Sequence, residues 1–450
     1  MKIQLSDHFN YHKLLKFCLP SIIMMVFTSI YGVVDGLFIS NFVGKVSFAA
    51  INLIMPFNMI LGGVGFMIGT GGSALVAKTL GEGKKELANK YFSMMIIITI
   101  TLGIILSVIG FIIAPSVAVA LGANQSMLDE CITYTRKLLI FNSAFMLQNV
   151  FQSFLVTAEK PKMGLAVTVV AGLTNMVLDA LFIAVFKWGV SGAAIATGIS
   201  QCTGGLLPLI FFLNKNNGSK LRLVKTKLRL KPILNACTNG VSELMSNIST
   251  SLVSMLYNIQ LMKNLHENGV AAYGVIMYVQ FVFIGIFIGY SIGTAPIVGY
   301  NYGAKNNEEV KNMRHKSTII MSVTGTTMML LAQLLASTVA KIFVGYDKTL
   351  FELTEHAFRL FSFSFVLAGL NIYVSSFFTA LNNGLISAVV SFFRTLVFQS
   401  ICVIVLPLIM GADGIWLANT AAEICAFAIS QALLFINRKK IPLYVDISTV

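Results

Sequence analysis

Twelve long apolar stretches constrain this chain more than any other feature of its sequence. Each has the roughly 20 residues that an α-helix needs to cross the hydrocarbon core of a bilayer. They lie at about 14–40, 49–77, 91–121, 128–157, 163–186, 190–213, 232–262, 271–300, 315–344, 350–380, 385–408 and 412–436. Runs this long, without alternation, exclude barrel strands. With 56% hydrophobic and 11% charged residues, the chain is predicted to be an all-α polytopic membrane protein of twelve transmembrane helices.

The distribution of positive charge predicts the orientation. If both termini are cytoplasmic, 23 of the 32 Lys and Arg residues fall in the termini and cytoplasmic loops, and five in outer loops. This is a positive-inside bias, and it predicts a multi-pass protein of the cytoplasmic (inner) membrane. The segment 215–231 carries seven basic residues and no acid. We interpret it as a linker lying over anionic lipid headgroups, and we expect no nucleic-acid partner.

The two halves of the sequence match at a constant offset of 222 residues. Matched pairs include Ala49-Ala50 with Ala271-Ala272, Gly81 with Gly303, Glu86 with Glu308, Phe141 with Phe363, Thr157-Ala158 with Thr379-Ala380, and Gly192 with Gly414. Six spans per half predict a parallel repeat, with a pseudo-twofold axis along the membrane normal. The expected domains are an N-terminal lobe (1–213), a basic cytoplasmic linker (214–231) and a C-terminal lobe with a short cytoplasmic tail (232–450). Such lobes enclose a central cavity in transporters.

Two carboxylates lie inside the predicted spans of the first half. Asp35 and Asp179 are expected at similar depth, together with Asn175, Thr197 and Tyr134. An ionisable side chain at the centre of a span costs roughly 3 kcal/mol or more, and it usually marks an ion or proton path. These oxygen atoms suit Na⁺, and two close carboxylates that cannot both stay ionised can hold a proton. We therefore predict a cation site, for H⁺ or Na⁺.

The alternative is that structural hydrogen bonds satisfy each acid separately. The repeat offers a test of this alternative. At the offset of 222, the positions equivalent to Asp35, Asn175, Asp179 and Thr197 are Tyr257, Val397, Ile401 and Asn419. The second half builds the same scaffold without these acids, so packing does not require them. The functional interpretation is favoured.

Three further charged residues and one proline lie inside predicted spans. Arg394 and Glu423 are expected near mid-depth on neighbouring spans, where a structural ion pair is favoured over a cavity role. Glu243 could line the cavity or join a polar network. Pro20 shares its span with Asp35, and prolines in apolar spans are expected to bend them. We interpret Pro20 as a hinge.

The chain resembles the multidrug and toxin extrusion (MATE) transporters, in the bacterial DinF-like and MepA-like group. The resemblance covers nearly all 450 residues. It rests on VVDGLFISNFVG around Asp35, on NMVLDALFIAVFKWGVSGAAIATGIS (175–200) and on GADGIWLANTAAE (411–423). The second stretch is the most specific. The resemblance implies twelve helices in two lobes that open alternately to each side of the membrane.

The resemblance also implies roles for individual residues. In the family, an acid on the first helix, an Asn and an Asp on the fifth and a Thr on the sixth form the cation site. The positions that match this pattern are Asp35, Asn175, Asp179 and Thr197, with Tyr134 matching a nearby tyrosine and Pro20 a proline where the first helix bends.

The chain departs from another branch of the family in one respect. That branch carries acids on helices 7 and 10 of the second lobe. The first of them aligns near Thr250, and Glu243 is not an obvious equivalent. Coupling through the second lobe is therefore in doubt, and the first-lobe site is favoured.

The expected function is that of a secondary active efflux antiporter. It would exchange H⁺ or Na⁺ for amphipathic, often cationic, drug-like molecules, as a monomer without a cofactor. A lipid-linked oligosaccharide flippase shares this architecture, but it should have a strongly cationic cavity. A membrane enzyme is disfavoured because the spans contain no HExxH, DDxxD or GxSxG motif. The chain also lacks the nucleotide-binding motif GxxxxGK[ST], which argues against an ATP-driven pump.

Overall fold

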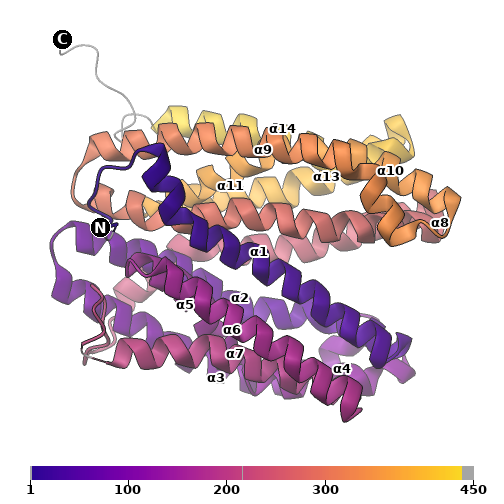
Figure 1. The fold of residues 1–450 in the computed structure, drawn as a ribbon, viewed down its shortest axis with the longest axis horizontal. Coiled ribbons are helices and arrows are strands. Elements are labelled where there is room, and N and C mark those ends of the chain that lie inside the picture. Colours follow the sequence, from indigo (N-terminus) through magenta and orange to yellow (C-terminus); the bar gives the residue numbers. More distant parts are fainter. Residues whose placement is uncertain (1–2, 215, 438–450) are drawn as a thin grey trace.

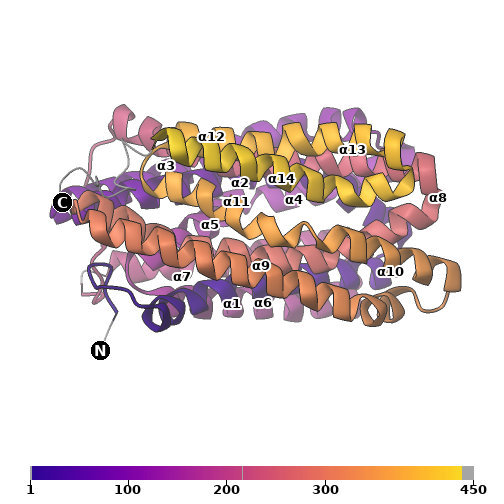
Figure 2. The same cartoon turned by 90° about the horizontal axis from the view of Figure 1, so that it is seen from above.

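The computed structural model describes residues 3–214 and 216–437, and nearly all of them are helical. The two halves of the chain form two lobes that lie side by side (Figure 1). The N-terminal lobe contains α1 (Tyr11–Phe42), α2 (Lys45–Gly81), α3 (Lys85–Ala120), α4 (Gln125–Leu139), α5 (Asn142–Thr157), α6 (Pro161–Asp179), the π-helix η1 (Ala180–Val185) and α7 (Gly189–Leu213). The C-terminal lobe contains α8 (Leu230–Gly303), α9 (Asn307–Val344), α10 (Lys348–Ser362), α11 (Phe365–Ala380), α12 (Gly384–Phe392), the π-helix η2 (Phe393–Val397), α13 (Phe398–Met410) and α14 (Ala412–Ile436). The helices of the C-terminal lobe run along the long axis of the molecule (Figure 2).

These helices account for twelve spans. Nine helices of the described residues are long and apolar enough to cross a membrane, and the bent pairs α4–α5 and α10–α11 add two more. The twelfth comes from α8, whose 74 residues include a non-helical residue, His266. A straight helix of that length would measure about 110 Å, far more than a bilayer core of about 30 Å. The predicted all-helical, twelve-span fold is confirmed.

The breaks in the helices follow the repeat, not the prolines. α1, α2 and α8 run continuously through Pro20, Pro56 and Pro296. The sharp bends lie between α4 and α5 (59°) and between α10 and α11 (46°), at equivalent points of the two lobes. Left-handed backbone angles also recur at the offset of 222: Gly44 and His266, Gly83 and Lys305, Gly189 and Gly411. The repeat is therefore conformational as well as sequential.

The lobes meet where glycines let helix backbones touch. At Gly81 an added methyl group would overlap the Tyr300 carbonyl oxygen, and at Gly303 it would overlap that of Lys78. Gly81 and Gly303 are each other's repeat equivalents, so this contact lies on the pseudo-twofold axis. Small residues allow this close approach between membrane helices.

A second pair of contacts obeys the same symmetry. Gly71 on α2 lies against Gly240 on α8, and Gly293 on α8 lies against Cys18 on α1. Adding 222 to Cys18 gives Gly240, and adding 222 to Gly71 gives Gly293. The interface is thus isologous, as in a twofold dimer, although one chain makes both sides.

The lobes separate away from these contacts. We call the end that holds residues 3–10 and 216–229 the linker end (left in Figure 1). Moving away from it, the nearest atom to a methyl group on Gly289 is 2.6 Å away, and on Gly285 it is 3.1 Å away. At Gly274 no described atom lies within 4 Å. The seam between the lobes is therefore closed at the linker end and widens beyond it.

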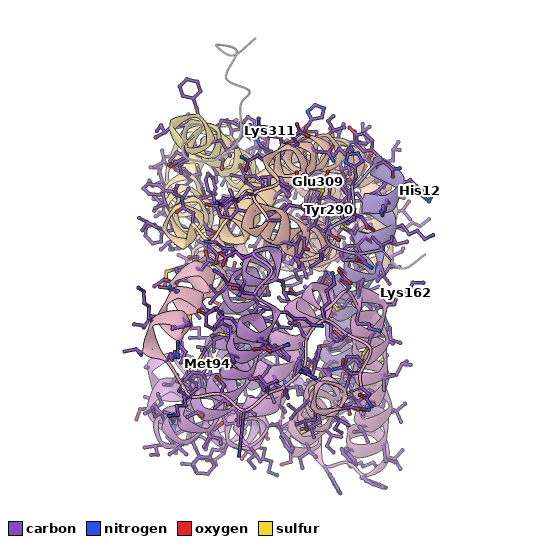
Figure 3. All side chains as sticks on the ribbon, turned by 90° about the vertical axis from the view of Figure 1, so that its left-hand side faces the viewer. His12, Met94, Lys162, Tyr290, Glu309 and Lys311 are labelled. Atoms are coloured by element: carbon purple, nitrogen blue, oxygen red, sulfur yellow. The ribbon has the colours of Figure 1, made fainter. Side chains whose placement is uncertain are left out.

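Residues 3–10 tie the lobes together at the linker end. They precede α1 of the N-terminal lobe, yet the Phe9 N–H donates to Glu309 Oε1 of the C-terminal lobe at 3.0 Å. The Leu5 N–H donates to Glu159 Oε1 of the N-terminal lobe at 2.8 Å. Figure 3 looks onto this end, with Glu309 in the C-terminal lobe. Leu5 and Phe9 are fully buried, so this segment is an ordered bridge between the lobes.

The linker makes the converse bridge. Residues 216–229 precede α8 of the C-terminal lobe but dock on α3 of the N-terminal lobe. The Arg222 N–H donates to Asn89 Oδ1 at 2.9 Å. The Val224 N–H donates to Ser93 Oγ at 2.9 Å. Each lobe is therefore held to the other by the segment that leads into its own first helix.

The seam yields a stability prediction with a control on the same helix. Gly240→Ala places a methyl group against the Met67 carbonyl oxygen, whereas Gly274→Ala places one in open space. Both changes gain about 1 kcal/mol of helix propensity, but overpacking at Gly240 costs about 1–3 kcal/mol. In thermal unfolding of the detergent-solubilised protein, Gly240→Ala should melt below Gly274→Ala. Equal melting temperatures would contradict the close contact.

Candidate functional site

The five predicted site residues of the N-terminal lobe come from four helices. Asp35 lies on α1, Tyr134 on α4, Asn175 and Asp179 on α6, and Thr197 on α7. The Asp35 carboxylate lies beside Asp179 and Asn175. The Asn175 amide Nδ2 donates to Thr197 Oγ1 at 3.5 Å, and Tyr134 lies within electrostatic range of both carboxylates. The structure therefore brings all five together in one cluster.

The cluster is rich in hydrogen-bond acceptors and poor in donors. Within the described part of the chain, Asp35 Oδ1, Asn175 Oδ1 and both Asp179 oxygens are buried without a hydrogen-bond partner. Asp179 is 0% exposed. Unpaired buried acceptors are costly, and two adjacent carboxylates cannot bond each other unless one carries a proton. A proton or a small cation bound between these oxygens would offset that cost.

Local structure explains how these side chains reach one another. Gly172, one turn before Asn175, lets α1 approach α6, because a methyl group there would lie 2.5 Å from the Phe27 ring. Asp179 is the last residue of α6, and η1 begins directly after it. Single π-helical turns inside α-helices occur frequently at functional sites. Ser200 Oγ donates to the Ala171 carbonyl oxygen at 2.7 Å and fixes α7 against α6.

Tyr31, a neighbour of Asp35, and Gln148, which contacts Tyr31, were not among the predicted residues. Tyr31 lies within electrostatic range of Asp35, and its hydroxyl interacts with Gln148 of α5. Tyr31 precedes Asp35 by four residues, a spacing that puts both on one helix face. That spacing is a signal that the sequence contained. No comparable spacing points to Gln148, because only the packing of α5 in the lobe brings it to Tyr31.

The equivalent region of the C-terminal lobe has different chemistry. Tyr257, which corresponds to Asp35, is buried and stacks on Tyr273 with ring centroids 5.0 Å apart. Asn419, which corresponds to Thr197, accepts a hydrogen bond from Gln399 at 2.9 Å. The scaffold is repeated, but the pair of carboxylates is not.

The structure pairs Arg394 with Glu423. Arg394 Nη2 lies 2.8 Å from Glu423 Oε1, and Nε donates to the same oxygen at 2.9 Å. Asn371 Nδ2 donates to Glu423 Oε2 at 2.7 Å. Glu423 is 2% exposed, so its buried charge is fully partnered. Arg394 lies in η2, so each lobe has a π-helix beside its buried charges.

The remaining two predicted residues lie along the lobe seam. Pro20 is on α1 between Cys18, which contacts Gly293, and Ile22, which contacts Gly289. Glu243 is on α8, within electrostatic range of Arg394. Neither belongs to the cluster around Asp35.

Comparisons with known proteins agree with this architecture. A sequence model of the MatE family matches residues 20–181 and 244–404, once in each half. Multidrug export protein MepA of Staphylococcus aureus (strain MRSA252) is 22% identical over 439 residues, which cover 97% of this chain and 95% of that protein. MepA of Staphylococcus haemolyticus (strain JCSC1435) is 23% identical over 416 residues, covering 92% and 91%. The outward-facing conformation of a multidrug resistance MATE family transporter of the MOP superfamily has a TM-score of 0.89 at 23% identity, covering 97% and 98%.

The ion pair of the C-terminal lobe gives a prediction for a double-mutant cycle. Arg394→Met leaves the Glu423 charge buried and unpaired, which should cost about 3–5 kcal/mol. Adding Glu423→Gln removes that charge and keeps an acceptor for Asn371, so the double variant should recover much of the loss. Thermal unfolding of the four proteins in one detergent measures the coupling. Additive losses would show that the pair is not a structural unit.

Proposed function

The chain belongs to the MatE family, and we propose that it is a secondary active multidrug exporter. In this proposal it exchanges H⁺ or Na⁺ for amphipathic, often cationic, organic molecules. It does so by alternating access in the cytoplasmic membrane, with both termini cytoplasmic. The observation that carries the proposal is the cluster of unpartnered buried acceptors at Asp35, Asn175 and Asp179. The named function of the MepA relatives, multidrug export, supports the substrate class.

The N-terminal cluster supplies the coupling in this proposal. Asp35 and Asp179 share a proton, or bind Na⁺ together with oxygens of Asn175 and Thr197. Tyr134 of α4 is 1% exposed and lies beside both carboxylates. Binding neutralises a carboxylate that otherwise lacks a donor, so the loaded and empty sites favour different packing of α1. The gradient can bias the lobes only by that difference in affinity.

The lobe seam supports alternating access. Glycine contacts close the linker end, and the seam widens beyond Gly285. With the linker end cytoplasmic, this arrangement opens toward the outside. The opposite state requires Gly71 and Gly240 to part and the far ends of the lobes to meet. Rigid-body rocking about a repeat interface is the usual form of such a transition.

A lipid-linked oligosaccharide flippase is the weaker alternative. It would need cationic side chains free to bind a pyrophosphate. The basic residue deep in the C-terminal lobe, Arg394, already has its charge neutralised by Glu423. The observed charges therefore favour export of cations over transfer of an anionic lipid.

Neutralising either carboxylate tests the coupling. Asp35→Asn and Asp179→Asn keep the shape of the side chain but remove its titratable charge. We expect each variant to lose gradient-driven efflux of a cationic dye from proteoliposomes while expressing and folding normally. Asp413→Asn is the control, because Asp413 is an exposed carboxylate paired with His356. Wild-type efflux rates in either site variant would sink the proposal.

The same vesicles identify the coupling ion. Efflux is measured first under an imposed Na⁺ gradient at equal pH, and then under an imposed pH gradient without Na⁺. The ion whose gradient drives efflux in the wild type should fail to drive it in Asp35→Asn. Efflux that needs neither gradient would rule out secondary active transport.

Pro20 yields a separate prediction about the moving helix. Proline leaves one backbone carbonyl of α1 without its donor, which lets the helix bend there at modest cost. Pro20→Ala restores that bond, so we expect gradient-driven efflux to fall while substrate affinity stays within about twofold. Pro115→Ala in α3 is the control, since that proline also lies inside an apolar helix. Undiminished efflux in Pro20→Ala would make this proline a packing feature only.

A further inference from the structure

Glu243 lies where the two lobes begin to separate. On the same helix, Gly240 is pressed against the Met67 carbonyl oxygen of α2. Two turns beyond Gly240, Asn247 is 3.9 Å from a methyl group built on Gly63 of α2. Glu243 lies between Gly240 and Asn247 along α8, where the close contact with α2 ends and the seam begins to widen.

The direction of Glu243 follows from helix geometry. At about 100° per residue, it lies about 60° from the face of α8 on which Gly240 meets α2. It lies about 40° from Asn239, which packs against Gly384 at the start of α12. Its side chain therefore points between α2 of one lobe and α12–η2 of the other, toward Arg394 on η2.

The Glu243 carboxylate has no partner that neutralises it. Among residues 3–214 and 216–437, no side chain or backbone group donates a hydrogen bond to it, and it forms no ion pair within 4.0 Å. The nearby positive charge of Arg394 is already held by Glu423, which Asn371 also contacts. With Glu243 ionised at −1, Arg394 at +1 and Glu423 at −1, this region would carry a net charge of −1.

We propose that Glu243 binds the positive charge of the transported organic cation where the seam between the lobes begins to widen. This inference rests on the proposed function and adds its charge-recognition residue. A carboxylate in a partly desolvated seam attracts a cation far more strongly than one in water. A lipophilic cation brings its own apolar surface and little hydration, so it can reach this depth. The site is separate from the Asp35–Asp179 cluster, which takes the coupling ion.

The proposal assigns the two ligands to different lobes. The coupling ion neutralises the N-terminal lobe, and the drug neutralises the C-terminal lobe. Competition between them then acts through the packing of the lobes against each other and does not require a shared carboxylate. The Arg394–Glu423 pair has a supporting role. Because its two charges cancel, a monovalent cation is enough to neutralise the remaining charge of Glu243.

The test is equilibrium binding of tetraphenylphosphonium to the purified full-length protein, without any gradient. Glu243→Gln should raise the dissociation constant at least about tenfold, and Glu243→Asp should restore most of the affinity. Uncharged triphenylphosphine oxide should bind all three proteins within about twofold. Glu267→Gln is the matched control, an exposed carboxylate on the same helix.

The outcomes separate this inference from the proposed function. Unchanged tetraphenylphosphonium affinity in Glu243→Gln, or an equal loss for the uncharged probe, overturns the role of Glu243 alone. A greater loss in Asp35→Asn than in Glu243→Gln places charge recognition in the N-terminal lobe and also overturns it. A wild-type protein that binds no lipophilic cation overturns the proposed substrate class. If Glu243→Gln does not fold, Glu243→Asp must still discriminate the charged probe from the uncharged one.

Discussion

The backbone contact between α2 and α8 at Gly81 and Gly303 is the constraint on which the rest of the structure depends. It lies on the pseudo-twofold axis, and the Gly71–Gly240 and Cys18–Gly293 contacts flank it symmetrically. Lipid chains are as apolar as the helices, so close packing between small residues replaces the hydrophobic effect as the force between spans. Without side chains at these points, the lobes can meet at one end and diverge at the other.

The bridges at the linker end use the same symmetry. Residues 3–10 bind Glu309 of the opposite lobe, and residues 216–229 bind Asn89 of the opposite lobe. Both bridges provide hydrogen-bond acceptors for backbone N–H groups that would otherwise be buried without a partner between the lobes. Separating the lobes at this end would therefore break glycine packing and backbone hydrogen bonds together. This favours two discrete arrangements over gradual opening.

The lobes share a scaffold but differ in how they hold charge. Among the described residues, Asp35 Oδ1 and both Asp179 oxygens are buried without a hydrogen-bond partner, whereas Glu423 is held by Arg394 and Asn371. Of these two arrangements, only the first would gain from binding a cation, because an ion there would offset a desolvation cost. Glu243 lies close to this neutralised pair, and within the described residues no group donates a hydrogen bond to its carboxylate.

The sequence by itself determined the twelve spans, the repeat and the composition of the N-terminal cluster, because span length, offset and helical spacing are local properties of the chain. The sequence could also have predicted Tyr31, because it lies four residues before Asp35 on the same helix face. Tertiary structure alone decided where helices break, since α4–α5 and α10–α11 bend without proline, while α1 runs through Pro20. It also decided that Asn371 donates a hydrogen bond to Glu423, and that in the described part of the chain no group donates one to the Glu243 carboxylate. Such pairings depend on how helices distant in the sequence rotate and pack, and hydropathy does not encode that rotation.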